Sequence, residues 1–215
     1  MFDRLLHLLF PPKCILCRRV LQDQQTDLCG SCRQSVREFT GPKKKYSFIA
    51  GWTALWYYED AVRESMKQFK FYNHPSYADS YGRLLAMHLM KEDMLDFDIL
   101  TWVPVSAKRK WQRGYDQVEL IAKAVAKELS VTAQPTLCKH RHAPPQSGIR
   151  DAAARRANIQ GAYRALDPSR LQGKRILLLD DIVTTGSTAS ECARILLTAG
   201  AKEVIFAAVA ATDHK

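Results

Sequence analysis

The sequence has no apolar run that approaches the ~20 residues needed to span a bilayer. Its opening residues, MFDRLLHLLFPPKC, lack the basic start and small-residue cleavage site of a secretory signal, and Pro11 and Pro12 interrupt the short apolar patch. Both absences favour a cytoplasmic protein without a membrane span. In that reducing compartment, disulfides are a poor first explanation for the six cysteines.

Internal repeats, low-complexity tracts and a G-x-x-x-x-G-K-[ST] segment are absent as well, and the last absence excludes a Walker A nucleotide site. The composition is that of an ordinary globular protein, with 47% hydrophobic and 25% charged residues. A length of 215 residues suffices for one well-buried domain with a small appendage.

Acidic residues are scarcer than basic ones, 22 against 32, which gives a net charge of +10. The excess lies in two blocks. Residues 1–45 carry nine basic and four acidic side chains, and residues 101–175 carry fifteen and five. Such clustering favours a polyanionic partner, either nucleic acid or a phosphorylated small molecule, over a merely solubilising surface.

Four cysteines near the start form two C-x2-C knuckles: Cys14, Cys17, Cys29 and Cys32. Each knuckle can direct two thiolates at one ion, and two knuckles complete a tetrahedral zinc site. The intervening RRVLQDQQTDL has too few apolar groups to form a core, so the metal would supply the folding energy. Two disulfides, a redox pair and an iron–sulfur cluster are the alternatives. We predict a structural zinc, because four thiolates leave no open position for catalysis. Cys138 and Cys192 lie far away and are expected in the core.

The segment FTGPKKKYS after the cysteines is typical of a linker, because it combines Gly-Pro with three lysines. We place the domain boundary there. The expected units are a zinc module with an N-terminal helix over residues 1–44 and a larger domain over residues 45–215.

The larger domain alternates strand and helix patterns, which predicts an α/β fold with a parallel sheet flanked by helices. Strands are expected at residues 48–60, 97–106, 175–181 and 203–211. Helices are expected at residues 60–72, 78–93, 116–129 and 187–201. The last strand–helix–strand unit implies a right-handed crossover, so its loops lie at the carboxyl edge of the sheet, where such folds bind ligands.

The stretch AKRKWQRGYDQ, between a strand and a helix, is interpreted as a basic loop at that same edge. Its two aromatic residues can stack on bases, or they can equally pack the loop against the domain. Together with the linker lysines, this loop is the predicted nucleic-acid surface: Lys43, Lys44, Lys45, Lys108, Arg109, Lys110, Trp111, Arg113 and Tyr115.

The stretch RILLLDDIVTTGST, residues 175–188, ends a buried strand in two carboxylates and continues in a hydroxyl-rich loop before a helix. The loop consists of Thr184, Thr185, Gly186, Ser187 and Thr188. Backbone amides at a helix N-terminus bind phosphate well. Asp180 and Asp181 can instead accept hydrogen bonds from vicinal hydroxyls or hold Mg²⁺ through oxygen ligands. A phosphate beside a diol, with Mg²⁺ near, describes a ribose 5-phosphate.

This stretch resembles the motif that binds 5-phosphoribosyl 1-diphosphate (PRPP) in type I phosphoribosyltransferases. The resemblance implies that Asp180 and Asp181 form the catalytic pair, contacting the ribose hydroxyls beside Mg²⁺, and that residues 184–188 bind the 5-phosphate. It also implies a pyrophosphate-binding loop after VPVS, formed by Ser106, Ala107 and Lys108.

Four features run nearly from end to end of the chain: LLFPPKCILC, VPVSAKRKWQRGYDQVELIA, QSGIRDAAARRANIQGAY and the PRPP motif. Together they resemble the ComF/GntX family of competence-associated proteins. Many relatives have further CxxC pairs, and Phe is common where this chain has Tyr115 and Tyr163. The family is linked to single-stranded DNA taken up during natural transformation. The resemblance therefore implies single-stranded DNA, PRPP and other competence proteins as partners.

Three functions fit these features. The first is a DNA-uptake accessory protein that binds PRPP with Mg²⁺ and single-stranded DNA. The second is a phosphoribosyltransferase acting on an unidentified base or amine, which the intact acidic pair favours. The third is a PRPP-responsive regulatory protein that signals through the zinc module.

Overall fold

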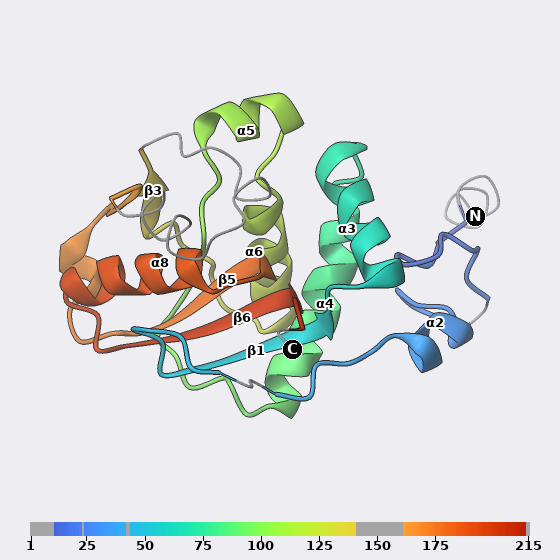
Figure 1. Ribbon diagram of the computed structural model, residues 1–215, viewed down its shortest axis with the longest axis horizontal. Helices are drawn as coiled ribbons and strands as arrows, with labels where there is room; N and C mark the ends of the chain where they lie inside the picture. Colours follow the sequence, from blue (N-terminus) through green and yellow to red (C-terminus); the bar gives the residue numbers. More distant parts are fainter. Residues whose placement is uncertain (1–10, 23, 42–43, 141–160, 214–215) are drawn as a thin grey trace.

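The computed structural model describes residues 11–22, 24–41, 44–140 and 161–213 (Figure 1). At its centre is a four-stranded parallel sheet in the order β1–β6–β5–β2. Its strands are β1 (Gly51–Tyr57), β6 (Glu203–Ala211), β5 (Arg175–Val183) and β2 (Ile99–Trp102). Every predicted strand is present, so the expected α/β class is confirmed. The N-terminal helix expected in the zinc module lies outside the described residues.

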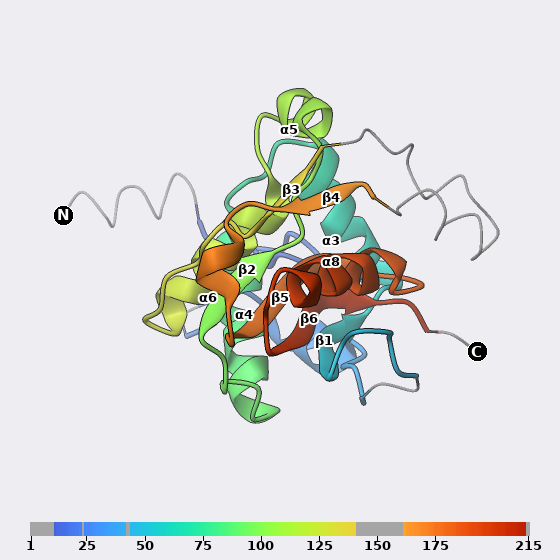
Figure 2. The same ribbon diagram turned by 90° about the vertical axis from the view of Figure 1, so that its left-hand side faces the viewer.

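Helices cover both faces of the sheet (Figure 2). The helices α4 (Tyr77–Lys91) and α6 (Gln117–Glu128) lie on one face, and α8 (Ser187–Thr198) lies on the other. Side chains alternate along a strand, so Leu177 and Leu179 of β5 pack on the α4 and α6 side, whereas Ile176 and Leu178 pack on the α8 side. No helix within the described ranges is long and apolar enough to cross a membrane.

The helix α3 (Asp60–Phe71) packs beside α4 through the completely buried Phe69, whose ring lies 5.6 Å from that of Tyr81, and its Met66 is completely buried in the same core. Its position matters for the site because its last turn reaches the carboxyl edge of the sheet, where β5 carries the two carboxylates.

The stretch interpreted as a basic loop is a helix instead, α5 (Ala107–Arg113). The side chain of Ser106 accepts a hydrogen bond from the backbone N–H of Arg109, and Gly114, with φ of +78°, ends the helix. None of the seven helical residues is buried, so the sequence contains no apolar stripe from which this helix could be predicted.

Four smaller elements were not predicted: the short helix α2 (Gly30–Ser35), an antiparallel pair of β3 (Leu137–Lys139) and β4 (Tyr163–Ala165), and the 3-10 helix η2 (Pro168–Leu171). Each is too short to show a periodic pattern. Cys192 is buried in the core as expected, whereas Cys138, on β3, is only half-buried.

Candidate functional site

The acidic pair, Asp180 and Asp181, lies on β5 at the carboxyl edge of the sheet. Because side chains alternate, the two carboxylates serve different surroundings. Asp180 is partly exposed and lines a small cavity together with residues 182–189. Asp181 is buried, and its contacts come from α3 and α6.

Asp181 is held by two side chains that sequence reasoning missed. The ammonium of Lys70 lies 2.9 Å from Asp181 Oδ2, and Gln117 Nε2 donates a hydrogen bond of 2.9 Å to the same oxygen. Burial alone would raise the pKa of Asp181, but the charge of Lys70 and these two hydrogen bonds outweigh it and hold that pKa below its usual value.

The pKa of Asp180 is shifted in the opposite direction. Burial and the neighbouring charge of Asp181 raise the pKa of Asp180 well above its usual value, although the backbone N–H of Asp181 donates a hydrogen bond of 2.8 Å to Asp180 Oδ1. Without a bound cation, the two carboxylates together favour a single negative charge, on Asp181. A cation bound next to them would favour ionisation of both.

The chemistry of this edge fits a magnesium ion. Carboxylate and amide oxygens are the ligands that Mg²⁺ prefers. Gln117 Oε1 is buried and has no hydrogen-bond partner among the described residues, and the amide nitrogen of the same side chain already binds Asp181. This unsatisfied buried oxygen, on a side chain that contacts the carboxylate of Asp181, is available to a cation or to the water bound to it.

The hydroxyl-rich loop at residues 184–188, which we term the phosphate loop, leads directly into α8. Thr185 and Ser187 share a hydrogen bond of 2.8 Å between their hydroxyls, and Gly186 has φ of +74°. The loop lies beside Asp180 around one cavity, so the structure brings the acidic pair and the phosphate loop together at one edge.

Tyr46, from the segment after the cysteines, lies directly on the phosphate loop. Its hydroxyl donates a hydrogen bond of 3.4 Å to the carbonyl of Thr184, and its ring stacks on Trp52 at 4.7 Å. A Cβ at Gly186 would come within 2.3 Å of that ring. Glycine is required here twice, by the backbone conformation and by the close approach of Tyr46.

We expect Gly186→Ala to lower the free energy of unfolding by about 2–4 kcal/mol, combining the left-handed backbone cost with overpacking against Tyr46. Gly173→Ala is the matched control, since Gly173 has φ of +70° but no atom within 4 Å of an added Cβ. Urea denaturation of both variants measures the difference, and equal losses would show that Tyr46 does not constrain the loop.

The candidates for pyrophosphate binding, Ser106, Ala107 and Lys108, form the start of α5. Ser106 is buried and caps the helix, while Ala107 and Lys108 are exposed. The turn is tied to α6 through Asp116, whose carboxylate accepts hydrogen bonds from the backbone N–H groups of Val105 and Val118.

The predicted nucleic-acid residues divide between two places. Arg109, Arg113 and Tyr115 line a cleft between α3 and α5. Lys44 and Lys45 line a different pocket, of about 480 Å³, together with Thr185 and Ser187 of the phosphate loop. Lys43 lies outside the described residues.

The two aromatic residues of this surface differ. Tyr115 packs against Phe69 at 5.9 Å between ring centroids, and its hydroxyl donates a hydrogen bond to the carbonyl of Phe69. Trp111 is 85% exposed and makes no aromatic contact within the described part of the chain, so its ring can stack on a base. Of the remaining α5 cations, Lys110 forms an ion pair with Glu119 at 3.0 Å.

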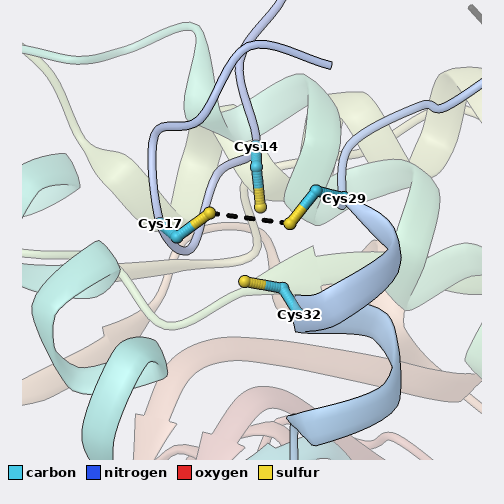
Figure 3. A group of neighbouring side chains, drawn as sticks. All are labelled: Cys14, Cys17, Cys29 and Cys32. Atoms are coloured by element: carbon cyan, nitrogen blue, oxygen red, sulfur yellow. Dashed lines mark hydrogen bonds between the residues drawn. The ribbon is translucent and has the colours of Figure 1, made fainter. Parts of the chain in front are cut away.

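The four cysteine side chains point toward one another, as Figure 3 shows. Their sulfur atoms all lie within 4.8 Å of one another, and those of Cys17 and Cys29 are 3.6 Å apart. A tetrahedral zinc with bonds of about 2.3 Å needs sulfur atoms about 3.8 Å apart, so the cluster fits that ion. Cys29 begins α2 (Gly30–Ser35), and the hydroxyl of Ser31 helps to lower the pKa of Cys29 to about 6, whereas burial raises the pKa values of Cys17 and Cys32.

The cysteine module packs on α3 and α4. Ile15 and Leu16 are buried in the same core cluster as Met66 of α3. Arg83 of α4 forms two hydrogen bonds with the buried carboxylate of Asp27, at 2.5 and 3.2 Å. The cysteine module therefore supports α3, the helix that carries Lys70.

Comparison with protein families gives two matches. Residues 119–215 match the phosphoribosyl transferase domain, and residues 5–43 match the double zinc ribbon domain. The first match covers β5, the phosphate loop and α8, and the second covers all four cysteines.

Several curated proteins are similar along most of the chain. Competence protein F of Haemophilus influenzae is 25% identical, over 89% of this chain and 93% of its own length. DNA utilization protein YhgH of Salmonella typhi is 28% identical, over 90% and 94%. Competence protein ComFC of Streptococcus pneumoniae is 24% identical, over 87% and 77%. Among solved structures, glutamine PRPP amidotransferase from B. subtilis overlaps 66% of this chain and 30% of its own, with 21% identity and a TM-score of 0.44.

Proposed function

Because the chain belongs to the ComF family, we propose that it is an accessory protein of DNA uptake that binds PRPP with Mg²⁺ and also binds single-stranded DNA. The names of its relatives, which refer to competence and to DNA utilization, support a role in DNA uptake. The candidate site supports the binding of PRPP and of single-stranded DNA.

A single observation carries the PRPP proposal: the acidic pair and the phosphate loop meet at one sheet edge beside the N-terminus of α8. Amides of residues 184–188 would bind the 5-phosphate, and Asp180 and Asp181 would accept hydrogen bonds from the ribose hydroxyls. Asp180, Asp181 and Gln117 are the residues that would hold Mg²⁺, which would neutralise the charge of the pyrophosphate.

Calorimetric titration of the intact protein with PRPP tests this proposal. We expect binding in Mg²⁺ that weakens about tenfold or more when EDTA is present, because the carboxylates and the pyrophosphate then repel each other. Ribose 5-phosphate is the control ligand, since it lacks the pyrophosphate and should depend less on the metal. Equal PRPP affinity in Mg²⁺ and in EDTA would contradict the role assigned to the acidic pair.

The proposed single-strand surface consists of the cations of α5 with the exposed Trp111, assisted by the lysines at 43–45. Neutralising phosphates releases counterions, so the logarithm of affinity should fall linearly with the logarithm of salt concentration. Stacking on Trp111 should add a contribution that depends less on salt.

We therefore expect Lys108→Gln with Lys110→Gln to flatten the salt dependence, and Trp111→Ala to weaken binding about fivefold or more at every salt concentration. Fluorescence anisotropy of a labelled oligodeoxythymidylate measures both. Lys202→Gln is the charge control, because this exposed lysine lies at the opposite edge of the sheet, before β6. Absence of single-strand binding even at low salt would remove the physical support for the uptake function.

In that event the second candidate, a phosphoribosyltransferase, takes first place. The observation that favours it is the intact acidic pair, with a large cleft beside Asp181 on the α3 side. Release of pyrophosphate from PRPP in the presence of candidate bases or amines is the assay that distinguishes the two functions.

A further inference from the structure

A cleft of about 1060 Å³ lies between α3 and α5, and we term it the α3–α5 cleft. In Figure 1, α5 lies at the top of the view with α3 to its right. Ligand pockets typically measure about 300–1,000 Å³, so the cleft has room for a nucleotide. Sequence reasoning assigned only its α5 wall, through Arg109, Arg113 and Tyr115.

The charge of the cleft has one sign. Its described lining includes no acidic residue. Four cationic residues line it, two from each wall: Lys67, Lys70, Arg109 and Arg113. Lys67 is paired with Glu64 at the exposed rim, whereas Lys70 is only 16% exposed and reaches Asp181. A ligand that fits these walls carries negative charge.

The cleft also presents aromatic rings. Phe71 is 65% exposed, and the guanidinium of Arg113 lies 5.0 Å from its ring centroid, so a flat cation and an open ring stand together. Tyr58 and Tyr115 line the interior. Bases stack on such rings and guanidinium planes without sequence preference, so this wall of the cleft can accept a base.

From this combination we propose that the α3–α5 cleft binds a nucleotide unit, with its base on Phe71 and Arg113 and its phosphate on Lys67, Lys70 and Arg109. Lys70 then lies between that phosphate and Asp181. The nucleotide would therefore lie beside the proposed ribose position, where a base or amine acceptor would have to bind. The inference rests on the proposed function only for identifying the neighbouring ligand as PRPP. The nucleotide can be free or part of a single strand. Tyr72 and Trp111, which are 63% and 85% exposed, follow and precede the lining residues Phe71 and Gln112 in the chain and offer further rings for a strand.

Two probes separate these sources: deoxyadenosine 5′-monophosphate by calorimetry, and a fluorescein-labelled oligodeoxyadenylate by anisotropy, both without PRPP at low salt. We expect both to bind, the oligonucleotide more tightly because it reaches the outer rings. Phe71→Ala should weaken both by about fivefold or more, since one stacked base is lost. Lys67→Gln should weaken both and reduce the salt slope by about one unit, as loss of a phosphate contact does.

Matched controls come from exposed residues that do not line the cleft. Met87→Ala removes an apolar side chain that is 61% exposed on α4, and Lys202→Gln removes one charge, and both should bind as the unchanged protein does. Binding of only one probe, with the same sensitivity to Phe71→Ala and Lys67→Gln, identifies the source and supports the cleft. If neither probe binds, or if both cleft variants bind normally, the proposal is overturned. PRPP titration of the same variants tells this failure from failure of the PRPP site.

Discussion

Replacing Cys29 with serine is expected to lower the melting temperature by about 6–20 °C. Without the fourth thiolate the metal is lost, and the loop that places Ile15 and Leu16 in the core with Met66 loses its order. Exposing two such side chains costs at least ~3–5 kcal/mol. For a chain of this size, each kcal/mol shifts the melting temperature by about 2–4 °C.

Differential scanning calorimetry gives the shift, and elemental analysis of protein purified without added metal should find one zinc per chain. Cys138→Ser is the matched control, because this half-buried cysteine lies outside the cluster. A Cys29→Ser protein as stable as the unchanged one, iron in place of zinc, or two disulfides by mass spectrometry would refute a structural zinc site.

The second large effect is expected in PRPP binding. Asp180→Asn combined with Asp181→Asn retains the shape of both side chains but removes the charges that would hold Mg²⁺ and the ribose hydroxyls. We expect PRPP affinity to fall by at least about tenfold, or ~1.4 kcal/mol. Calorimetric titration in Mg²⁺ is the measurement.

The control for that variant is Asp167→Asn, which removes one exposed carboxylate next to η2, away from the phosphate loop. It should bind PRPP as the unchanged protein does. A folded double variant with unchanged affinity would mean that the acidic pair has another task, even if the phosphate loop still binds a phosphate.

Local sequence patterns predicted the elements that hold the acidic pair. Four buried apolar residues followed by two carboxylates, a hydroxyl loop and an amphipathic segment specify strand, loop and helix through short-range physics, and β5, the phosphate loop and α8 follow that order. The knuckle spacing likewise predicted that four sulfur atoms come together.

The same local patterns could not predict which side chains contact the acidic pair and the phosphate loop. Lys70 lies 111 residues from Asp181 in the chain, and Tyr46 lies 138 from Thr184, so only the packed fold brings each pair together. Lys70 resembled any other lysine at the polar end of α3, and Tyr46 resembled part of a linker. Gln117 carried no signal, since a glutamine in the first turn of a helix is usually exposed.

A crystal structure with PRPP and Mg²⁺ tests the central claim most directly. We predict that the 5-phosphate lies on the backbone amides of residues 184–188 and that the ribose hydroxyls contact Asp180 and Asp181, with Mg²⁺ beside them. Density for PRPP that leaves the phosphate loop empty, or a ribose that does not touch either carboxylate, would contradict the account.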